Sequence, residues 1–548
     1  MQVGWAAAVQ APYHHAMEKQ FNTAGPNQPD IHYTLTPSDR INWPELSGLI
    51  DARKYFILHA PRQTGKTSLM LHLMHTLNAA GKYRALYVNV EGAQAARNDV
   101  NAAMQAILSA FASAASLYWG DEVLCQWTRT LAKNPDRQDA LRVVLEQASR
   151  TSPQPIIIFL DEVDALVGDT LISLLRQIRA GYAQRPEAFP HSMVLCGVRD
   201  VRDYRIRRSD GEIITGGSAF NIKSESIRLG DFTQADVTAL LHQHTEATGQ
   251  AFEPAALEEI WLDTQGQPWL VNALAYQACF RDPTLRPRSQ TVTVEHMRQA
   301  REALIYRRDT HLDQLSDKLK EDRVRRVIEP LLESAGDVSG LHPDDVQYVY
   351  DLGLIKVNRP GQISIANRIY QEVIPRELTW GHQMGINQQQ AWYVTADGSL
   401  DIPKLLAAFQ QFFRENAESW LQRYTYFEAG PQLLLQAFLQ RIVNGGGRIA
   451  REYGLGRGRT DLLLQWPLTP QGFTGPMQQV VLELKIQHKS RAATLAAGLA
   501  QTARYADQCA AVESHLLIFD RDPKVPWDDK IYCETHQQGE RLISVWGM

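Results

Sequence analysis

The sequence predicts a multidomain α/β protein, and three features support this prediction. First, the chain has 548 residues, several times the roughly 100 to 200 residues of one domain. Second, short β-rich runs alternate with helical patterns from Lys54 to about Leu229, which predicts a parallel sheet with crossover helices. Third, helical and strand patterns resume after a Gln-rich stretch and continue to the C-terminus, which predicts a second α/β domain.

Composition and periodicity divide the chain into six segments. Pro, Asn, Asp and Thr are frequent from Phe21 to Arg40, so an extended arm is expected to precede the sheet. Helical spacing without strands follows the alternating block, and Val324 to Leu378 then shows the order helix, helix, hairpin of a winged-helix module. The expected segments are an arm (1–45), a sheet core (46–230), a helical lid (231–315), a winged-helix module (316–380), a linker (381–400) and a C-terminal domain (401–548).

Composition narrows the class of protein. Hydrophobic residues make up 44% and charged residues 21% of the chain, which excludes an intrinsically disordered protein. Lys and Arg total 56 against 61 Asp and Glu, so any nucleic-acid contact must be local. Five scattered cysteines favour reduced thiols over disulfides or zinc. The most apolar stretch, Met104 to Trp119, is expected to be a packed helix, so we expect a cytoplasmic protein without a membrane segment.

A loop between a predicted strand and a predicted helix carries the first chemical motif. Its residues Gly65, Lys66 and Thr67 match the end of the pattern G-x-x-x-x-G-K-[ST], with Ala60 in place of the first glycine. Such a loop directs backbone N–H groups at phosphate oxygens, while the lysine neutralises phosphate charge and the threonine hydroxyl ligates Mg²⁺. We therefore assign ATP binding to the consecutive residues Ala60, Pro61, Arg62, Gln63, Thr64, Gly65, Lys66, Thr67 and Ser68.

An acidic pair follows the apolar run Ile156 to Leu160 and forms the second nucleotide motif. Asp161 is expected to hold the Mg²⁺ shell, and Glu162 is expected to polarise the attacking water. The alternative is an acidic pair that merely starts a helix. After the next predicted strand, Arg199 is either a residue that senses the phosphates or an ordinary surface charge.

Five segments resemble the AAA-like ATPases of the archaeal-ATPase/STAND type: FNTAGP, YFILHAPRQTGKTSL, IIIFLDEVD, TQGQPWLVNALA, and DLGLI with IANRIYQEVIPREL. The resemblance covers residues 18–378. It implies an ATP-hydrolysing core, a helical lid and a winged helix, which commonly act as a nucleotide-gated switch beside an effector domain. Members of this group need not be hexameric motors, so the resemblance does not imply translocation.

The second chemical motif lies in the C-terminal domain. Asp461 opens one predicted strand, and Glu483 and Lys485 lie two residues apart on the next. Strand alternation places this pair on one face and turns Leu482 and Leu484 to the core, so one exposed polar face is expected to hold all three residues. Two carboxylates form an oxygen site for Mg²⁺ or Mn²⁺, and a nearby lysine can help to deprotonate a metal-bound water that attacks a phosphodiester. The alternative is a surface hairpin that carries these residues by chance.

The segments GRGRTD and ELK resemble the PD-(D/E)XK, restriction-endonuclease-like superfamily, although Thr460 stands where proline is usual. This resemblance implies a DNA-cutting nuclease. Gln501 and Tyr505 lie one helical turn apart and match the Q-x-x-x-Y helix of RecB-like members, where both residues support the active site and the DNA backbone. As the first-helix acid does in the superfamily, Glu428 could complete the metal shell, with Glu452 as its rival.

Arginine is concentrated next to this motif. From Arg441 to Arg459 the chain has five arginines and one acid, Glu452, which predicts a local positive patch. Such a patch suits contacts to a nucleic-acid backbone that do not read sequence. Solubility is the alternative explanation.

The two motifs together predict an ATPase fused to a metal-dependent nuclease, with ATP and Mg²⁺ or Mn²⁺ as cofactors. ATP binding is expected to rearrange the lid and the winged-helix module and so to license phosphodiester cleavage. DNA is favoured over RNA; endonuclease or exonuclease action, a homo-oligomer and a protein activator stay open. The alternative hypothesis is an ATP-dependent switch whose C-terminal domain only binds nucleic acid or protein. By analogy, such fusions look like parts of prokaryotic defence or mobile-element systems.

Overall fold

The computed structural model describes most of the chain, which forms two compact units. These are Met1–Arg307 with Asp351–Gly353, and Arg308–Tyr350 with Leu354–Met548. The described residues are 18–134, 139–199, 205–207, 213–215, 221–307, 315, 317–333, 341–359, 362–374, 392–421, 435, 438–439, 447–451, 462–469, 475–487, 490–520, 522 and 524–548.

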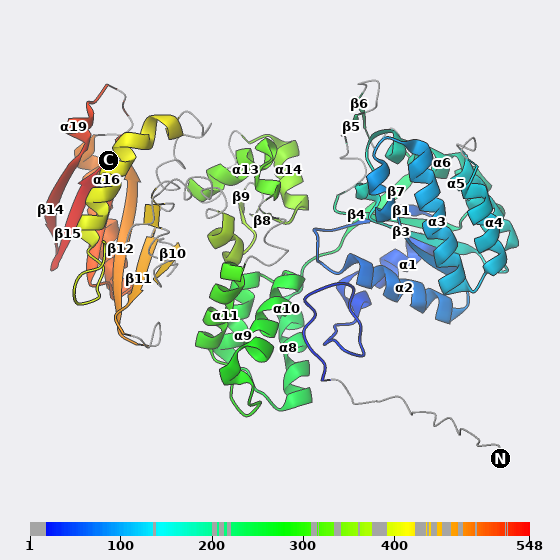
Figure 1. The fold of residues 1–548 in the computed structure, drawn as a ribbon, viewed down its shortest axis with the longest axis horizontal. Coiled ribbons are helices and arrows are strands. Elements are labelled where there is room, and N and C mark those ends of the chain that lie inside the picture. Colours follow the sequence, from blue (N-terminus) through cyan, green and yellow to red (C-terminus); the bar gives the residue numbers. More distant parts are fainter. Residues whose placement is uncertain are drawn as a thin grey trace, which may run out of the picture. The chain divides into compact units, whose positions relative to one another are not determined.

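A parallel sheet forms the centre of the first unit (Figure 1). It has five strands in the order β2-β3-β4-β1-β7. Strands β1, β3 and β4 are buried along their whole length, as expected for a parallel sheet with helices on both faces. The predicted parallel sheet is therefore confirmed. The strands are β1 (Tyr55–His59), β2 (Arg84–Asn89), β3 (Ile156–Asp161), β4 (Ser192–Gly197) and β7 (Lys223–Arg228), with a separate hairpin of β5 (Arg205–Arg207) and β6 (Ile213–Thr215).

Helices cover both faces of this sheet, and each face has its own apolar core. One core joins α1 and α2 to the sheet, and the other joins α3, α5 and α6 to the opposite face. The helices are α1 (Trp43–Asp51), α2 (Lys66–Ala80), α3 (Val100–Trp119), α4 (Glu122–Ala132), α5 (Ala140–Thr151) and α6 (Gly168–Gly181), with short turns η1 (Pro37–Arg40), η2 (Glu91–Ala96), η3 (Val163–Ala165) and η4 (Tyr182–Gln184).

Helix α3 is the one helix of the described chain that is long and apolar enough, by length and composition, to cross a membrane. Its apolar residues recur every three or four positions and are buried against the sheet and neighbouring helices. The core helix of a globular domain meets the same length and composition test, so this finding is weak evidence for a membrane span.

Four helices follow the sheet and form the lid segment, and the N-terminal arm packs against them. Phe21 and Tyr33 of the arm are buried, and the Tyr33 hydroxyl lies 3.0 Å from Nδ1 of His244 in α8. The helices are α8 (Gln234–Thr248), α9 (Pro254–Thr264), α10 (Pro268–Tyr276) and α11 (Val294–Arg307), with a π-helical turn η6 (Gln277–Arg281) and a short turn η7 (Pro283–Leu285) after α10.

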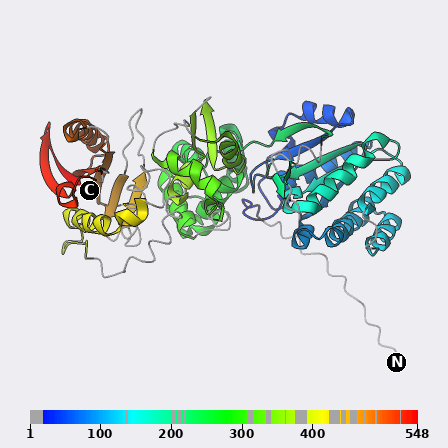
Figure 2. The ribbon, with the colours of Figure 1, turned by 90° about the horizontal axis from the view of Figure 1, so that it is seen from above.

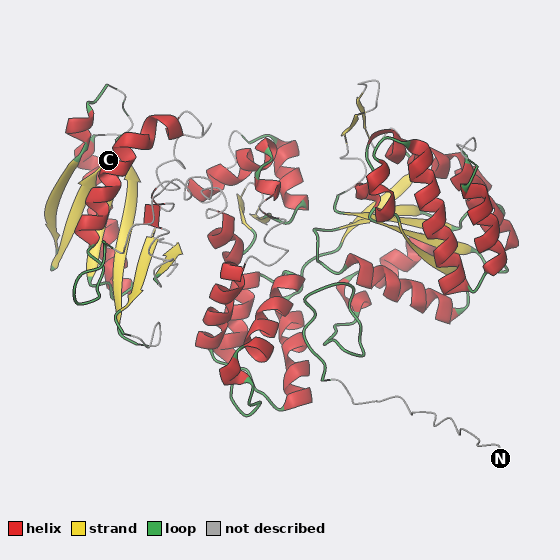
Figure 3. Cartoon of the chain, in the orientation of Figure 1, coloured by secondary structure: helices red, strands yellow, loops and turns green. Residues whose placement is uncertain are grey.

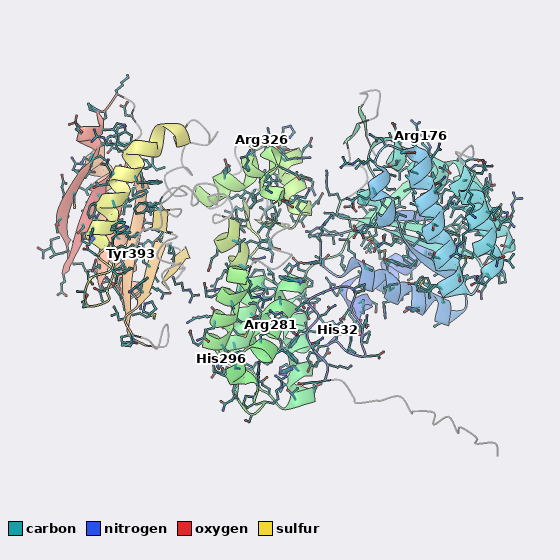
Figure 4. All side chains as sticks on the ribbon, viewed as in Figure 1. His32, Arg176, Arg281, His296, Arg326 and Tyr393 are labelled. Atoms are coloured by element: carbon teal, nitrogen blue, oxygen red, sulfur yellow. The ribbon has the colours of Figure 1, made fainter. Side chains whose placement is uncertain are left out.

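The second unit begins with the expected order of helix, helix and hairpin. Its elements are α13 (Asp322–Glu333), α14 (Pro343–Asp351), and the antiparallel strands β8 (Ile355–Arg359) and β9 (Gln362–Ile365). Arg326, labelled in Figure 4, and Arg323 of α13 pair with Asp345 of α14 at 3.0 and 3.3 Å. These ion pairs join the two helices of the module.

A mixed sheet forms the centre of the rest of the second unit, drawn in yellow in Figure 3. It has six strands in the order β10-β11-β12-β13-β15-β14. Helix α16 covers one face and α18 the other, so the sheet lies between two helical layers (Figure 2). The predicted second α/β domain is thus present. Its elements are α16 (Ile402–Leu421), β10 (Arg448–Arg451), β11 (Leu462–Pro467), β12 (Met477–Ile486), α18 (Arg491–Gln508), β13 (Glu513–Phe519), α19 (Trp527–Lys530), β14 (Tyr532–Gln538) and β15 (Arg541–Gly547).

Part of the expected linker, 381–400, belongs to this domain. Tyr393, labelled in Figure 4, and Leu400 are buried in the core that α16 forms with the sheet, and Trp392 packs against this core. Trp466 of β11 donates a hydrogen bond to the carbonyl of Gly398. The expected boundary at residue 401 is therefore wrong, because aromatic residues in a polar stretch supply core side chains.

Gly498 allows α18 to approach the sheet closely. A Cβ atom at this position would lie 2.6 Å from Cδ2 of Leu516 on β13. We expect Gly498→Ala to lower the free energy of unfolding of the C-terminal domain by about 1–3 kcal/mol through overpacking. Chemical denaturation followed by circular dichroism measures this change, with exposed Ala500→Ser of the same helix as the control. Equal stability of both variants would show that α18 adjusts without cost.

Candidate functional sites

The loop from β1 to α2 has the backbone that a phosphate-binding loop requires. Gly65 precedes the first residue of α2 and has φ +92°, a left-handed backbone conformation that residues with a side chain rarely adopt. Gln63 also has a positive φ of 58°. The N–H groups at the start of α2 consequently face the loop that Ala60 to Gly65 form, where an anion would be stabilised.

Lys66 is buried beneath this loop. Its Nζ donates hydrogen bonds to the carbonyl oxygens of Ala60 at 2.9 Å and Pro61 at 3.0 Å. These two carbonyls hold the ammonium group inside the loop. Phosphate oxygens are stronger acceptors for an ammonium group than neutral carbonyls are.

Asp161 lies at the end of β3, is fully buried, and joins the two nucleotide motifs. Its Oδ2 accepts hydrogen bonds from Thr67 Oγ1 at 2.7 Å and from the Tyr87 hydroxyl at 2.8 Å. Its Oδ1 accepts from the backbone N–H of Glu162 at 2.9 Å. A hydroxyl and a carboxylate that converge in this way are the oxygen ligands that Mg²⁺ prefers, so these residues fit the ion.

Glu162 and Arg199 lie at the same carboxyl edge of the sheet. Burial, and then the Asp164 carboxylate, raise the pKa of Glu162. Glu162 has φ 58°, so the chain turns sharply after β3 before η3 begins. Arg199 follows β4 and lines a small cavity with Asp164 and Gly197. This position is near the expected phosphates, and a sensing role for Arg199 stays a prediction.

Arg40 and Tyr87 are contacts of this site that the sequence motifs missed. Arg40 of η1 donates to the Thr64 carbonyl at 2.7 Å and to the Gly230 carbonyl at 2.5 Å, and burial lowers its pKa to about 10. It therefore connects the phosphate-binding loop to the segment that leads into the lid. Neither residue belongs to a short motif. Arg40 lies 24 positions before Thr64, and Tyr87 lies 74 positions before Asp161.

A cavity of about 140 Å³ lies between the arm, the loop and the lid of the first unit. Asn27 of the arm donates its backbone N–H to Ser68 Oγ at 2.9 Å, and Trp269 of the lid donates to the Thr23 carbonyl at 2.9 Å. The cavity is lined mainly by residues of these three parts: Asn22, Asn27, Tyr33 and Arg40; Gln63, Thr64, Gly65 and Ser68; Phe232, Trp269 and Asn272.

In the C-terminal domain, Glu483 and Lys485 form an ion pair on β12. The Lys485 Nζ lies 2.8 Å from Glu483 Oε1. Glu483 is fully buried and the Lys485 side chain is 26% exposed. The expected exposed polar face is therefore wrong, because α18 covers this side of the sheet and packs Tyr505 against Val481.

Gln501 and Tyr505 lie on one face of α18, as their spacing predicts. Gln501 Nε2 lies 3.2 Å from the Tyr505 hydroxyl, and Tyr505 is buried. Their hydrogen bond is thus on the helix that covers the face of β12 carrying Glu483. A supporting role in catalysis stays a prediction.

Asp461, Glu428 and Glu452 lie outside the described residues. The antiparallel register pairs Leu462 of β11 with Leu482 of β12, and these two residues are the chain neighbours of Asp461 and Glu483. Of the arginines between 441 and 459, Arg448 and Arg451 lie on β10 and the others are outside the described part. Within the part of the chain that the structure describes, no three His, Cys, Asp or Glu residues are grouped as metal ligands.

Comparisons with known proteins found one family model and several solved structures. A family model described as an AAA-like domain matches residues 54–374. A solved Walker-type ATPase of Pyrococcus abyssi is 13% identical, with a TM-score of 0.44, and the match covers 65% of this chain and 99% of that one. The ORC2 protein of Aeropyrum pernix is 13% identical (62% and 95% covered, TM-score 0.35), and RuvB of Thermotoga maritima is 14% identical (60% and 93% covered, TM-score 0.32). No curated protein matches the sequence.

Proposed function

Because the chain belongs to the AAA-like domain family, we propose that it hydrolyses ATP and uses this reaction to control metal-dependent phosphodiester cleavage by its C-terminal domain. The first half of this proposal follows from the P-loop ATPase module. The second half rests on one observation: Lys485 Nζ lies 2.8 Å from the fully buried Glu483. Glu483 follows Leu482, which pairs with Leu462 of β11, and Asp461 precedes Leu462 in the sequence.

For ATP hydrolysis, the first unit supplies a positive loop and an acidic sheet edge. Lys66 would bind the phosphates in place of its two carbonyl contacts, and Thr67 and Asp161 would hold Mg²⁺. The ion, when bound, neutralises charge that develops on the phosphates. Glu162 orients and polarises the attacking water, and the cavity between arm and lid opens beside the phosphate-binding loop at Gln63, Thr64 and Gly65.

For phosphodiester cleavage, the C-terminal domain supplies carboxylates and a lysine. Asp461 and Glu483 would hold Mg²⁺ or Mn²⁺, with Glu428 as a further ligand. Lys485 orients or deprotonates the attacking water, and Gln501 and Tyr505 support the site. DNA is the favoured substrate because the ELK segment resembles DNA-cutting enzymes.

Nucleotide control is proposed to pass through the arm and the lid. Arg40 bonds to the phosphate-binding loop at Thr64 and to Gly230, which precedes the lid, so a change in the loop alters both contacts. Tyr33 fastens the arm to α8 by its contact with His244. The lid and the helix–helix–hairpin module then carry the change toward the nuclease.

A second candidate function is an ATP-dependent switch whose C-terminal domain binds nucleic acid or protein without cleaving it. Complete burial of Glu483 favours this alternative, because a metal ion must reach that carboxylate. The two functions differ in one respect that can be measured, the appearance of cleaved phosphodiester bonds.

The proposal is tested by incubating purified protein with labelled single-stranded DNA, duplex DNA and RNA in Mg²⁺ or Mn²⁺ with ATP. We expect DNA cleavage that disappears when the metal is chelated. Intact substrates in every mixture, with ATP hydrolysis present, would reject the nuclease and favour the second candidate.

Glu162→Gln is expected to separate binding of ATP from its hydrolysis. The amide keeps the shape of the side chain but is a poor base, so turnover should fall by about a hundredfold or more while ATP affinity is retained. Phosphate release and binding of a fluorescent ATP analogue measure the two quantities. Exposed Glu45→Gln on α1 is the control. A turnover near that of the wild type would assign the water-activating role to another residue.

A further inference from the structure

We propose that Tyr87 is a positioning residue that holds the Asp161 carboxylate in place for Mg²⁺, an inference that rests on the proposed ATPase function. Tyr87 lies on β2, the strand next to β3, and its backbone pairs in register with Phe159, two residues before Asp161. Its hydroxyl donates to Asp161 Oδ2 at 2.8 Å. The ring is buried in the apolar core that α2 shares with the sheet.

The carboxylate of Asp161 is oriented by three donors from three different segments. Thr67 and Tyr87 donate to Oδ2, and the Glu162 backbone donates to Oδ1. Donors on both oxygens oppose rotation of the carboxylate. The orientation of Asp161 is thereby determined before a nucleotide arrives.

Tyr87 differs from the other two donors in the kind of element on which it lies. Thr67 is itself an expected ligand of the ion and lies in the first turn of α2, and Glu162 belongs to the turn after β3 with a positive φ. Tyr87 stands on a strand of the sheet, so the sheet itself holds its hydroxyl in place. Contacts that orient metal ligands from rigid elements commonly determine metal affinity.

A structural explanation of Tyr87 is simply that a buried tyrosine needs an acceptor for its hydroxyl. Tyr55 on β1 provides the matched control for this explanation. It is fully buried in the same sheet, and its hydroxyl donates at 2.8 Å to the backbone carbonyl of Pro190 rather than to a carboxylate. Tyr55→Phe therefore removes a buried tyrosine hydroxyl without removing a donor to Asp161.

The experiment measures binding of a fluorescent ATP analogue to the full-length wild type, Tyr87→Phe and Tyr55→Phe while Mg²⁺ is titrated. We expect Tyr87→Phe to bind the analogue in EDTA as the wild type does, and to need about ten to a hundred times more Mg²⁺ for the metal-dependent gain in affinity. Tyr55→Phe should keep the wild-type midpoint. Thermal unfolding of both variants shows that each is folded.

An unchanged Mg²⁺ midpoint in Tyr87→Phe would overturn the inference while the ATP site stands. An equal shift in Tyr55→Phe would also overturn it, because loss of any buried hydroxyl would then have the same effect. Failure of the wild type itself to bind the analogue would reject the ATP site and the role of Tyr87 together.

Discussion

Replacing Lys66 with alanine is expected to reduce ATP turnover by about a hundredfold or more. Its Nζ lies at the centre of the β1–α2 loop, bonded to two carbonyls that phosphate oxygens can replace as acceptors. Loss of a fixed cation at transferring phosphates removes stabilisation of charge in the transition state, an effect commonly of this size. The measurement is steady-state phosphate release at saturating Mg²⁺ and ATP.

Lys82→Ala is the control for this prediction, because Lys82 is an exposed lysine of the same unit that pairs with Asp51 at 2.8 Å. A surface pair of this kind contributes little to stability, so its loss should leave turnover unchanged. Turnover by Lys66→Ala at the level of the wild type would show that the loop does not bind the transferring phosphate.

Replacing Lys485 with methionine is expected to reduce DNA cleavage by about a hundredfold or more and to leave ATP turnover unchanged. Methionine keeps most of the length of the side chain and removes the charge 2.8 Å from Glu483 Oε1. Loss of a group that activates or orients the attacking water commonly has an effect of this size. Separate assays of cleavage and phosphate release on the same preparation measure both activities.

Two variants control for damage to the fold. Removing Lys485 alone takes the ion-pair partner away from a buried carboxylate, which destabilises a domain by itself. A double variant, Glu483→Gln with Lys485→Met, removes both charges, so it should fold as well as the wild type and still fail to cleave. Exposed Lys524→Met of the same domain should cleave normally. Full cleavage by Lys485→Met would favour the non-catalytic alternative.

Four strands of the first unit's parallel sheet could be predicted because they are local apolar runs between helical patterns. The edge strand β7, with the polar sequence KSESIR, has no such signal. The N-terminal boundary of the C-terminal domain has no local signal in the sequence. Tyr393 and Leu400 lie in a polar stretch and become core residues only when α16 and the sheet assemble. Period-two alternation on β12 correctly separates Glu483 from Leu482, but it does not say what covers each face. The burial of Glu483 depends on α18, which begins at Arg491.

In the candidate sites too, residues of short motifs can be found from the sequence, whereas contacts between distant segments cannot. Lys66, Thr67 and Asp161 belong to short patterns, and the structure brings Thr67 to within 2.7 Å of Asp161. Tyr87 and Arg40 could not be found in this way, because their contacts join segments that are far apart in sequence. A polar group on an otherwise buried strand is the one local signal that Tyr87 offers.

The most direct test of nucleotide-controlled cleavage is one assay of supercoiled plasmid and labelled single-stranded DNA, in Mg²⁺ or Mn²⁺, with and without ATP. It compares the wild type with Lys66→Ala and Lys485→Met. We predict cleavage by the wild type that depends on ATP, loss of that dependence together with most of the cleavage in Lys66→Ala, and no cleavage by Lys485→Met. Intact DNA after incubation with a wild type that hydrolyses ATP would contradict the account.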